Sequence, residues 1–529
     1  MKKLYNILLS VLTASILVTA CNPADFGDIN KDPNNPSTAF TNYLFTSACT
    51  YVPYFVLGNA TNGYDPWQQE WPGYLSESKN NQYGPLATTS TYSTVSTIYL
   101  YALRNLHQII EMNEDPEQKD ASNVRAFGSN DNQIAVAKTL SAFYFMSVTD
   151  IVGPIVFTEA FQGLSDDNWT PKYDAQDKVY EGLETMLKEA YAQFKENEDL
   201  DGAADILYGG DVAKWKKFNA SIRMLLAIKM ADVDPANGKA RFAAAYADGG
   251  MESDDDSFTY TYDDLTWNRL YYWVSPDYSG AGFNAVPNKF IVDQMKAFKD
   301  NRMFKYFDIE GYRGKRPEDK FPRDSYDSFY GVPFGLSTND AVNAWTTVCC
   351  SINSSLIGMS ATVPVIPAAR VILTEAEAAL RGWISADAKT LYEKGITTSF
   401  EQWGAKDAAD YIASDLVAYD SSKALEQIAL QRWIASYMSD GVEAWADWRR
   451  LDIPKLPVGP GAVDSGNLHY PYRLGFYPDT DVAYNNANYL EAVKLLNGGK
   501  DDVNSRLWWD VADNEEGVIP AEECVPPAL

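Results

Sequence analysis

The sequence predicts an all-α-dominated protein in which tetratricopeptide-like helix pairs support a large, irregular, loop-rich ligand-binding face. Two observations predict this fold class. Apolar residues recur at helical spacing in several separate segments, and long stretches rich in Gly, Pro, Ser, Asn, Tyr and Trp lie between those segments. The 529 residues are 46% hydrophobic and 22% charged, which is the composition of an ordinary globular protein.

Each predicted helix has one apolar face. In residues 179–194, Val179, Leu183 and Leu187 fall on one side of a helix, and Lys188 falls on the other. The same spacing predicts helices over residues 94–112, 132–148, 214–230, 370–383, 391–403 and 424–438. Many of these segments come in pairs, as in tetratricopeptide hairpins, although the roughly 34-residue repeat of that class is not visible.

The irregular stretches are the predicted ligand-binding loops. They cover residues 59–91, 254–287 and 312–362, and such long irregular segments inside a globular chain are usually functional. Tyr and Trp rings offer flat, rigid faces to the C–H groups of a sugar, while amide side chains satisfy its hydroxyls. The candidate ligand-binding residues are Asn62, Tyr64, Trp67, Gln68, Trp71, Trp267, Tyr271, Trp273, Tyr330 and Trp345.

Composition argues against several classes of protein. The chain carries 44 basic and 72 acidic residues, for a net charge of −28, so nucleic acid is not an expected partner. Only His107 and His469 are present, which makes a multi-histidine zinc site impossible. No metal or cofactor is predicted, because the acidic run at 254–256 could bind calcium but is more simply a solvated face. No nucleotide-binding or nucleophile-elbow motif occurs, so no catalytic residue is predicted.

The N-terminus predicts secretion and lipid anchoring. A positive start at Lys2 and Lys3 precedes a short apolar stretch, and small residues lead to Cys21 in the manner of a bacterial lipobox. Acyl chains on Cys21 would hold the mature protein on a membrane without a spanning helix. By resemblance to other Gram-negative lipoproteins, the polar residues after Cys21 favour the outer membrane, with the protein facing outward.

Four stretches resemble motifs of the SusD/RagB family of outer-membrane nutrient-binding lipoproteins. Residues 26–34 read F-G-D-I-N-K-D-P-N, residues 149–157 read T-D-I-V-G-P-I-V-F, and residues 376–383 read A-E-A-A-L-R-G-W. The most specific stretch begins at 431 with Q-R-W-I and continues at 441 with G-V-E-A-W-A-D-W-R-R. The second motif departs from the family pattern at Pro154 and Ile155.

The resemblance implies a domain organisation. It implies a signal peptide at 1–20, a lipid-anchored tether at 21–40 and a single SusD-like domain at 41–529. Within that domain the helix pairs are expected mainly at 94–250 and 366–450, the ligand loops mainly at 59–91 and 251–365, and a wrapping tail at 451–529. The last motif is interpreted as architecture: Trp445 and Trp448 are expected to pack a junction, and Arg449 to find a carboxylate.

The resemblance also implies a function. Family members bind oligosaccharides, or peptides in the RagB branch, and release them into a partner SusC-like TonB-dependent transporter. The chain is therefore expected to be a binding protein and not an enzyme. Peptide cargo is the first alternative. A surface glycosidase or peptidase is the second, because 72 acidic residues offer many carboxylate pairs.

Overall fold

The computed structural model describes residues 39–57, 67–77, 94–263, 285–309, 320–336, 344–345, 348–464, 469–476, 478–512 and 517–527. The chain divides into two compact units, Met1–Phe40 and Thr41–Leu529. Only Ala39 and Phe40 of the first unit are described, and Cys21 lies outside the described residues. The helices and strands of the described residues all belong to the second unit.

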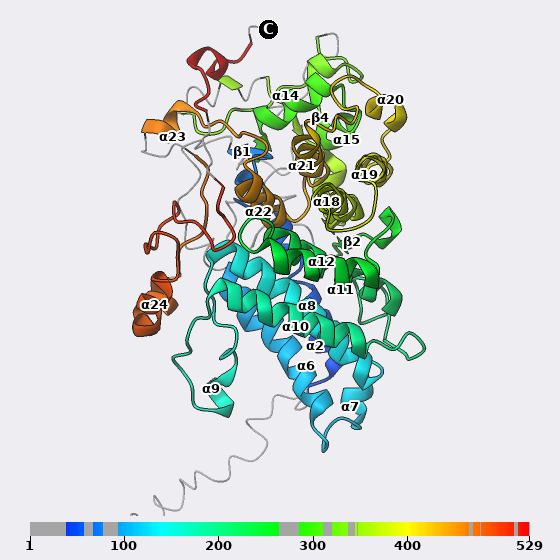
Figure 1. The fold of residues 1–529 in the computed structure, drawn as a ribbon, viewed down its shortest axis with the longest axis vertical. Helices are drawn as coiled ribbons and strands as arrows, with labels where there is room; N and C mark the ends of the chain where they lie inside the picture. Colours follow the sequence, from blue (N-terminus) through cyan, green and yellow to red (C-terminus); the bar gives the residue numbers. More distant parts are fainter. Residues whose placement is uncertain are drawn as a thin grey trace, which may run out of the picture. The chain divides into compact units, whose positions relative to one another are not determined.

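Helices dominate this unit, which confirms the predicted fold class (Figure 1). The longer ones are α2 (Thr41–Cys49), α6 (Arg104–Glu114), α8 (Asn130–Val152), α10 (Gln176–Gln193), α11 (Val212–Lys229), α12 (Pro235–Asp248), α14 (Lys289–Phe298), α18 (Ala368–Leu380), α19 (Ala388–Gln402), α21 (Ala424–Ala435) and α22 (Gly441–Leu451). Helix α8 packs against α6 and α10, α11 against α12, and α18 against α19 and α21. Packing of this kind is what amphipathic helices produce when they bury their apolar faces against one another.

Shorter helical turns connect these pairs. They are α3 (Tyr54–Leu57), α4 (Trp67–Glu70), α7 (Ser122–Arg125), α9 (Gln162–Ser165), α15 (Met303–Tyr306), α17 (Ser354–Ile357), α20 (Ala408–Ile412), α23 (Pro460–Asp464) and α24 (Asn486–Val493). Two π-helical segments, η2 (Ile98–Leu103) and η5 (Pro478–Tyr484), and three 3-10 turns, η3 (Asp254–Asp256), η4 (Tyr326–Ser328) and η6 (Ala521–Cys524), complete the helical structure of the described residues.

The helix ends follow from local chemistry. Asp211 caps α11 by accepting the Lys214 N–H at 3.0 Å, and Asp234 caps α12, whose first residue is Pro235. Helix α8 ends at Gly153, whose φ of 94° is accessible to glycine but strained for other residues. This turn is the T-D-x-x-G motif of the sequence.

Helix α8 is the central core helix. Its mean hydropathy of 1.2 and its length would allow it to cross a membrane, and it is the one such helix among the described residues. However, 94% of its apolar window is buried inside the protein, so its hydrophobicity serves the core. The C-terminal tail packs at its end, where Leu474 donates its N–H to the Ile151 carbonyl at 2.9 Å.

Three small antiparallel ladders join distant parts of the chain. Strand β1 (Leu75–Glu77) pairs with β3 (Ala285–Pro287), β2 (Phe258–Thr261) with β6 (Thr362–Ile366), and β4 (Phe307–Asp308) with β5 (Ser351–Ile352). Each ladder links segments from the region in which the sequence predicts loops. The described part of this region is therefore held together by short strand pairs.

Candidate ligand-binding face

Half of the predicted ligand-binding residues lie outside the described residues. They are Asn62, Tyr64, Trp267, Tyr271 and Trp273. Their role in binding stays a prediction.

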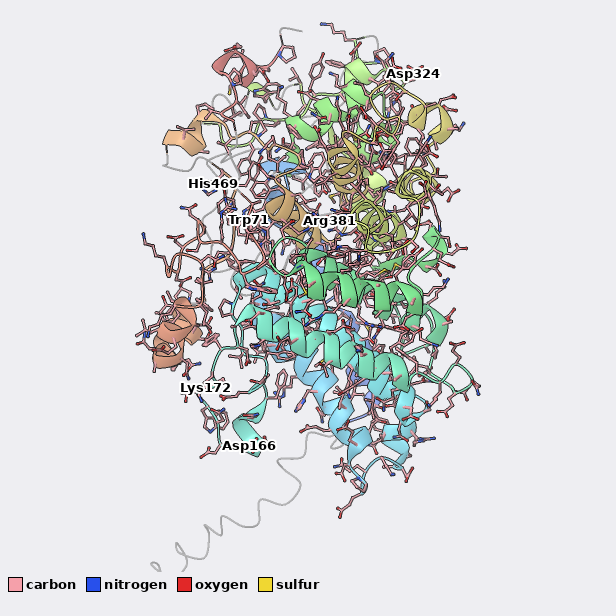
Figure 2. All side chains as sticks on the ribbon, in the orientation of Figure 1. Trp71, Asp166, Lys172, Asp324, Arg381 and His469 are labelled. Atoms are coloured by element: carbon pink, nitrogen blue, oxygen red, sulfur yellow. The ribbon has the colours of Figure 1, made fainter. Side chains whose placement is uncertain are left out.

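Trp67, Gln68 and Trp71 lie in the core, which corrects the expectation that they form an open aromatic surface. The ring centroids of Trp67 and Trp71 are 4.6 Å apart, and the Trp71 centroid lies 4.8 Å from that of Trp445 of α22. Figure 2 labels Trp71. Gln68 donates to the Tyr54 carbonyl at 3.0 Å. These contacts pack α4 and the residue that follows it against α22 and α3. The large apolar surfaces of the two indole rings are more stable when buried than when exposed to water.

Trp345 is also buried, with its indole N–H donating to the Cys524 carbonyl at 2.8 Å, so it too is a packing residue. Tyr330 is half-buried. The Lys296 ammonium lies 4.5 Å from the centroid of the Tyr330 ring, which is within the range of a cation–π contact. Among the described candidates, Tyr330 alone keeps partial access to solvent.

The ladders bring the attachment points of the predicted loops together. Glu77, where the chain enters residues 78–93, pairs directly with Ala285, where it leaves residues 264–284. Next to this ladder, Ser76 donates its hydroxyl to the Val332 carbonyl at 2.9 Å. Cys350 in turn donates its N–H to the Tyr330 carbonyl at 2.8 Å. Residues from three predicted loop regions that are far apart in sequence therefore lie next to one another in the fold.

Several exposed rings, Trp169 and Tyr484 among them, were not predicted from the sequence. Trp169 is 66% exposed and Tyr484 is 83% exposed. Trp169 sits in the stretch D-D-N-W-T-P at 166–171, where no apolar neighbour suggests a core contact. Trp71 lies among similar neighbours and is buried, so no local signal in the sequence identifies Trp169 as exposed.

An apolar cavity of about 360 Å³ lies between η2, the turn after α8, the segment around α9, and the tail. Tyr99, Phe161, Tyr173 and Phe476 line it. The Tyr99 hydroxyl donates to the Val156 carbonyl at 2.6 Å, and the Tyr173 hydroxyl donates to Asp481 Oδ1 at 2.7 Å. Both hydroxyls are already engaged, so the cavity offers mainly apolar surface.

The acidic run and the cysteines show no metal chemistry in the described part of the chain. Asp256 forms an ion pair with Lys217 at 3.0 Å. No group of three or more His, Cys, Asp or Glu residues within the described ranges is placed to hold a metal ion. Cys349 and Cys350 are both buried.

Comparison with known proteins identifies the family. The SusD-like family described as "Starch-binding associating with outer membrane" matches residues 33–478. The chain belongs to the SusD-like family. A search of curated proteins finds no match.

Solved structures share the fold of this SusD-like chain along nearly its whole length. A chitin-binding protein is 25% identical with a TM-score of 0.70, and the alignment covers 89% of this chain and 99% of that protein. A SusD homologue from Bacteroides uniformis is 24% identical with a TM-score of 0.73 and the same coverage. A chitin-binding SusD homologue from Flavobacterium johnsoniae is 23% identical with a TM-score of 0.72, again over 89% and 99% of the two chains.

Asp150, from the SusD-like T-D motif, is a buried centre of hydrogen bonding. Its Oδ2 pairs with the Lys229 ammonium at 2.6 Å, and its Oδ1 accepts from the Tyr180 hydroxyl at 2.6 Å and the Trp509 indole at 2.9 Å. Lys229 also pairs with Glu443 of α22. One carboxylate therefore joins α8, α10, α11 and the tail, which explains an acidic residue at the end of a core helix.

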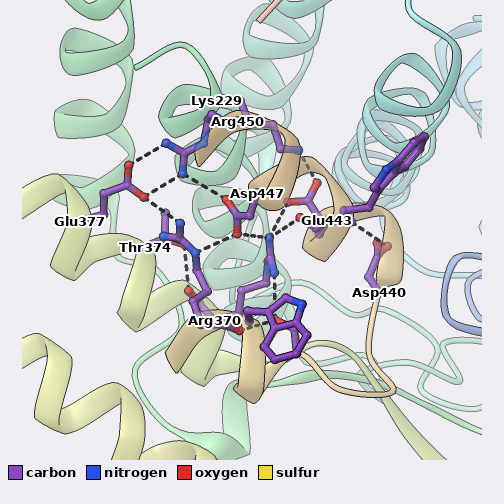
Figure 3. A network of polar contacts seen from close by, with 12 residues as sticks. Lys229, Arg370, Thr374, Glu377, Asp440, Glu443, Asp447 and Arg450 are labelled. Atoms are coloured by element: carbon purple, nitrogen blue, oxygen red, sulfur yellow. Dashed lines mark hydrogen bonds and ion pairs between the residues drawn. The ribbon is translucent and has the colours of Figure 1, made fainter. Parts of the chain in front are cut away.

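A second buried cluster, the Glu377 cluster, joins α18, α21 and α22 (Figure 3). Arg450 holds Glu377 with two contacts at 2.7 and 2.8 Å, and Arg432 reaches Glu377 at 2.8 Å. Asp447 pairs with Arg370 at 2.6 Å and with Arg432 at 2.8 Å. Burial opposes ionisation of Glu377, but Arg450 and Arg432 outweigh it and lower the pKa of Glu377 well below its usual range.

The G-V-E-A-W-A-D-W-R-R motif corrects one expectation and supports another. Arg449 was expected to find a carboxylate, but it donates to the backbone carbonyls of Asp150 at 2.8 Å and Tyr472 at 3.0 Å. Its guanidinium lies 3.5 Å from the centroid of the Trp445 ring. Stacking and carbonyl hydrogen bonds replace the ion pair. Apart from the partly buried Asp447, the residues of this motif are buried, in line with their interpretation as architecture.

Asp440, the N-cap of α22, gives a test of this buried electrostatics. Its Oδ1 accepts from the Val442 N–H at 2.9 Å, while Oδ2 has no hydrogen-bond partner within the described ranges. Burial, and then the charge of Glu443, raise the pKa of Asp440 from 3.8 to about 8. Because the folded state binds the Asp440 proton more tightly than the unfolded state does, this proton stabilises the folded protein. The stabilisation is fully present below the unfolded-state pKa of Asp440 and is lost as the pH rises through about 8.

We therefore expect Asp440→Asn to make stability less dependent on pH. Between pH 5 and 8, the unfolding free energy of the variant relative to that of the wild type should rise by up to about 1.4 kcal/mol per pH unit. Urea unfolding of both proteins measures this difference. Asp387→Asn is the matched control, because Asp387 caps α19 through Thr390 and its pKa is lowered. Asp387→Asn should show no such rise. If the unfolding free energies of wild type and Asp440→Asn changed equally with pH, the raised pKa of Asp440 would be contradicted.

Proposed function

We propose that this SusD-like chain is a cell-surface lipoprotein that binds oligosaccharides and delivers them to a partner TonB-dependent transporter. The observation that carries the proposal is membership of a family described as starch-binding and outer-membrane-associated, over residues 33–478. The 25% identity to a chitin-binding protein along 99% of its length adds support for a carbohydrate ligand. Attachment to the outer membrane would be through Cys21.

The architecture supports binding by converging loops. The β1/β3 ladder and its contact with Val332 hold points from all three predicted loop regions together. Those points are in turn fastened to the helical body, since Tyr74, next to β1, donates its hydroxyl to the Trp433 carbonyl of α21 at 2.6 Å. A rigid base of this kind limits the entropy lost when loops close on a ligand.

The proposed primary site consists of Asn62, Tyr64, Trp267, Tyr271, Trp273 and Tyr330. Trp67, Gln68, Trp71 and Trp345 are assigned to the supporting core because they are buried. Aromatic faces with neighbouring amides suit a neutral sugar chain, and a net charge of −28 disfavours anionic polysaccharides. Peptides are the alternative cargo, and turnover of bound cargo is not part of the proposal.

Binding measurements test this function. We expect the wild type to bind chitohexaose or maltohexaose by calorimetry, without hydrolysing either sugar. Trp273→Ala should weaken binding at least about tenfold if its ring stacks on the sugar, since such contacts contribute on the order of 1 kcal/mol or more. Tyr43→Ala is the control, because Tyr43 is an exposed ring on α2.

Two results would argue against the proposal, and a third would only revise the primary site. Binding of a tetrapeptide pool in place of any oligosaccharide would favour the peptide alternative. Release of reducing ends that disappears on mutating one carboxylate pair would favour an enzyme. Unchanged sugar binding in Trp273→Ala would remove that residue from the primary site while leaving carbohydrate binding intact.

A further inference from the structure

The segment that carries Trp169 is a closed loop, here called the Trp169 loop, which runs from 157 to 174. Its base is an antiparallel bridge in which Asp174 donates its N–H to the Ile155 carbonyl at 2.7 Å. The Asp174 carboxylate also accepts from the Thr158 N–H at 2.8 Å and the Phe157 N–H at 3.2 Å. One aspartate therefore fixes both ends of the loop.

Hydrogen bonds also connect residues in the interior of the Trp169 loop. Glu159 Oε2 accepts from the Asn168 side chain at 3.0 Å and from the Lys172 N–H at 2.8 Å. Phe161 and Asp167 adopt positive φ angles of 67° and 54°. Positive φ at a bulky residue such as Phe161 is unfavourable unless the surroundings enforce it, so the loop has one defined shape that its contacts maintain.

This shape holds the Trp169 indole in a fixed position in solvent. The indole N–H donates to Asp167 Oδ1 at 2.7 Å. The ring also lies over Gly163, where an added Cβ would be 3.1 Å from Cζ3 of Trp169. The side chain is nevertheless 66% exposed. The loop thus orients a large apolar ring without burying it.

The C-terminal tail brings a second exposed ring to the residues that follow Trp169. Asn485 donates to the Pro171 carbonyl at 2.7 Å and Asn488 to the Thr170 carbonyl at 2.8 Å, which ties the start of α24 to the Trp169 loop. Tyr484, the residue before Asn485, is 83% exposed. Figure 1 shows α9 and α24 on the same flank of the helical body, and Figure 2 labels Asp166 and Lys172 on the loop.

An oriented, solvent-exposed ring has little structural purpose of its own. Exposing an indole to water forgoes the stabilisation that burial would give, and the strained turns add to that cost. The ring faces, together with the carboxylates of Asp166 and Asp167, match the C–H face and the hydroxyls of a sugar. A preorganised ring also loses little entropy on binding.

We propose that Trp169 and Tyr484 form a second carbohydrate-contacting surface, distinct from the loops assigned to the primary site. This inference rests on the proposed carbohydrate-binding function. The surface would take part of a neutral polysaccharide whose other residues occupy the primary site, so it adds affinity for long chains and none for short ones. The ligand class is a neutral, extended glycan.

The test compares polymer and short ligand on the full chain. Depletion onto insoluble chitin, or onto insoluble starch if the wild type prefers maltohexaose, should be about two- to tenfold weaker for Trp169→Ala. Binding of the matching disaccharide should not change. Trp169→Phe should keep most of the polymer affinity because it keeps a flat ring, and it also guards against misfolding of the alanine variant. Tyr43→Ala is the control for ring exposure, since Tyr43 is likewise 66% exposed.

The outcomes separate the two proposals. Equal polymer binding by wild type and Trp169→Ala, with normal unfolding midpoints, would overturn the second surface and leave the primary function standing. Trp169-dependent binding of an oligolysine peptide without any effect on polymer would also overturn it, in favour of cation recognition by the ring and the acidic pair. Absence of any carbohydrate binding by the wild type would overturn the proposed function itself.

Discussion

Glu377→Gln is expected to destabilise the protein by about 3–5 kcal/mol, the largest effect of any electrostatic substitution proposed for this chain. The change keeps the shape of the side chain and removes its charge. Arg450 and Arg432 would then be buried without their main counter-charge, while Arg381 would lose its contact at 2.9 Å. Urea-unfolding free energies at pH 7 measure the loss.

The pH dependence gives this prediction a second readout. Because the folded-state pKa of Glu377 is lowered, its stabilisation is present above the unfolded pKa near 4.5 and is lost as the pH falls below it. The free-energy difference between wild type and variant should therefore shrink below about pH 4. A difference that stays constant down to pH 3 would show that shape, and not charge, sets the effect.

Glu393→Gln is the matched control. Glu393 faces Lys389 at 3.7 Å on an exposed surface of α19, so its loss should change stability by less than about 1 kcal/mol. Comparable effects at Glu377 and Glu393 would contradict the importance of the buried cluster.

The helices were predictable because the side of a helix that is buried carries apolar residues at regular helical spacing in the sequence. Residues 179–194 and 214–230 were expected to be helical, and the structure has α10 at Gln176–Gln193 and α11 at Val212–Lys229. The helix ends are set by caps such as Asp211, which lies outside the periodic stretch. Boundaries therefore shifted by a few residues while the elements themselves were confirmed.

The aromatic residues of irregular segments were not predictable in the same way. Trp71 and Trp169 both lie among polar and Pro-rich neighbours, but Trp71 packs on Trp445 and Trp169 stays in solvent. No local pattern encodes a contact made across more than 370 positions of sequence. The partners of Glu377 were hidden for the same reason, since Arg432 and Arg450 reach it from two other helices.

Among the glycines in the described residues, Gly441 is expected to be the one at which alanine is most disruptive. Gly441 begins α22 and packs against the backbone of α4, so an ideal Cβ there would overlap the Gln68 carbonyl oxygen and lie 2.5 Å from its carbon. Neither backbone can move freely, because the Gln69 side chain bonds the Val56 and Ser439 carbonyls at 2.6 and 2.8 Å. We expect a loss of at least about 3 kcal/mol, or failure to fold, by urea unfolding.

Gly358→Ala separates this steric effect from the general cost of replacing a glycine. Gly358 has a φ of −58°, and an added Cβ would meet its nearest atom at an ordinary 3.7 Å, so alanine there should be neutral or slightly stabilising. If Gly441→Ala were as stable as Gly358→Ala, the close packing of α22 on α4 would be wrong.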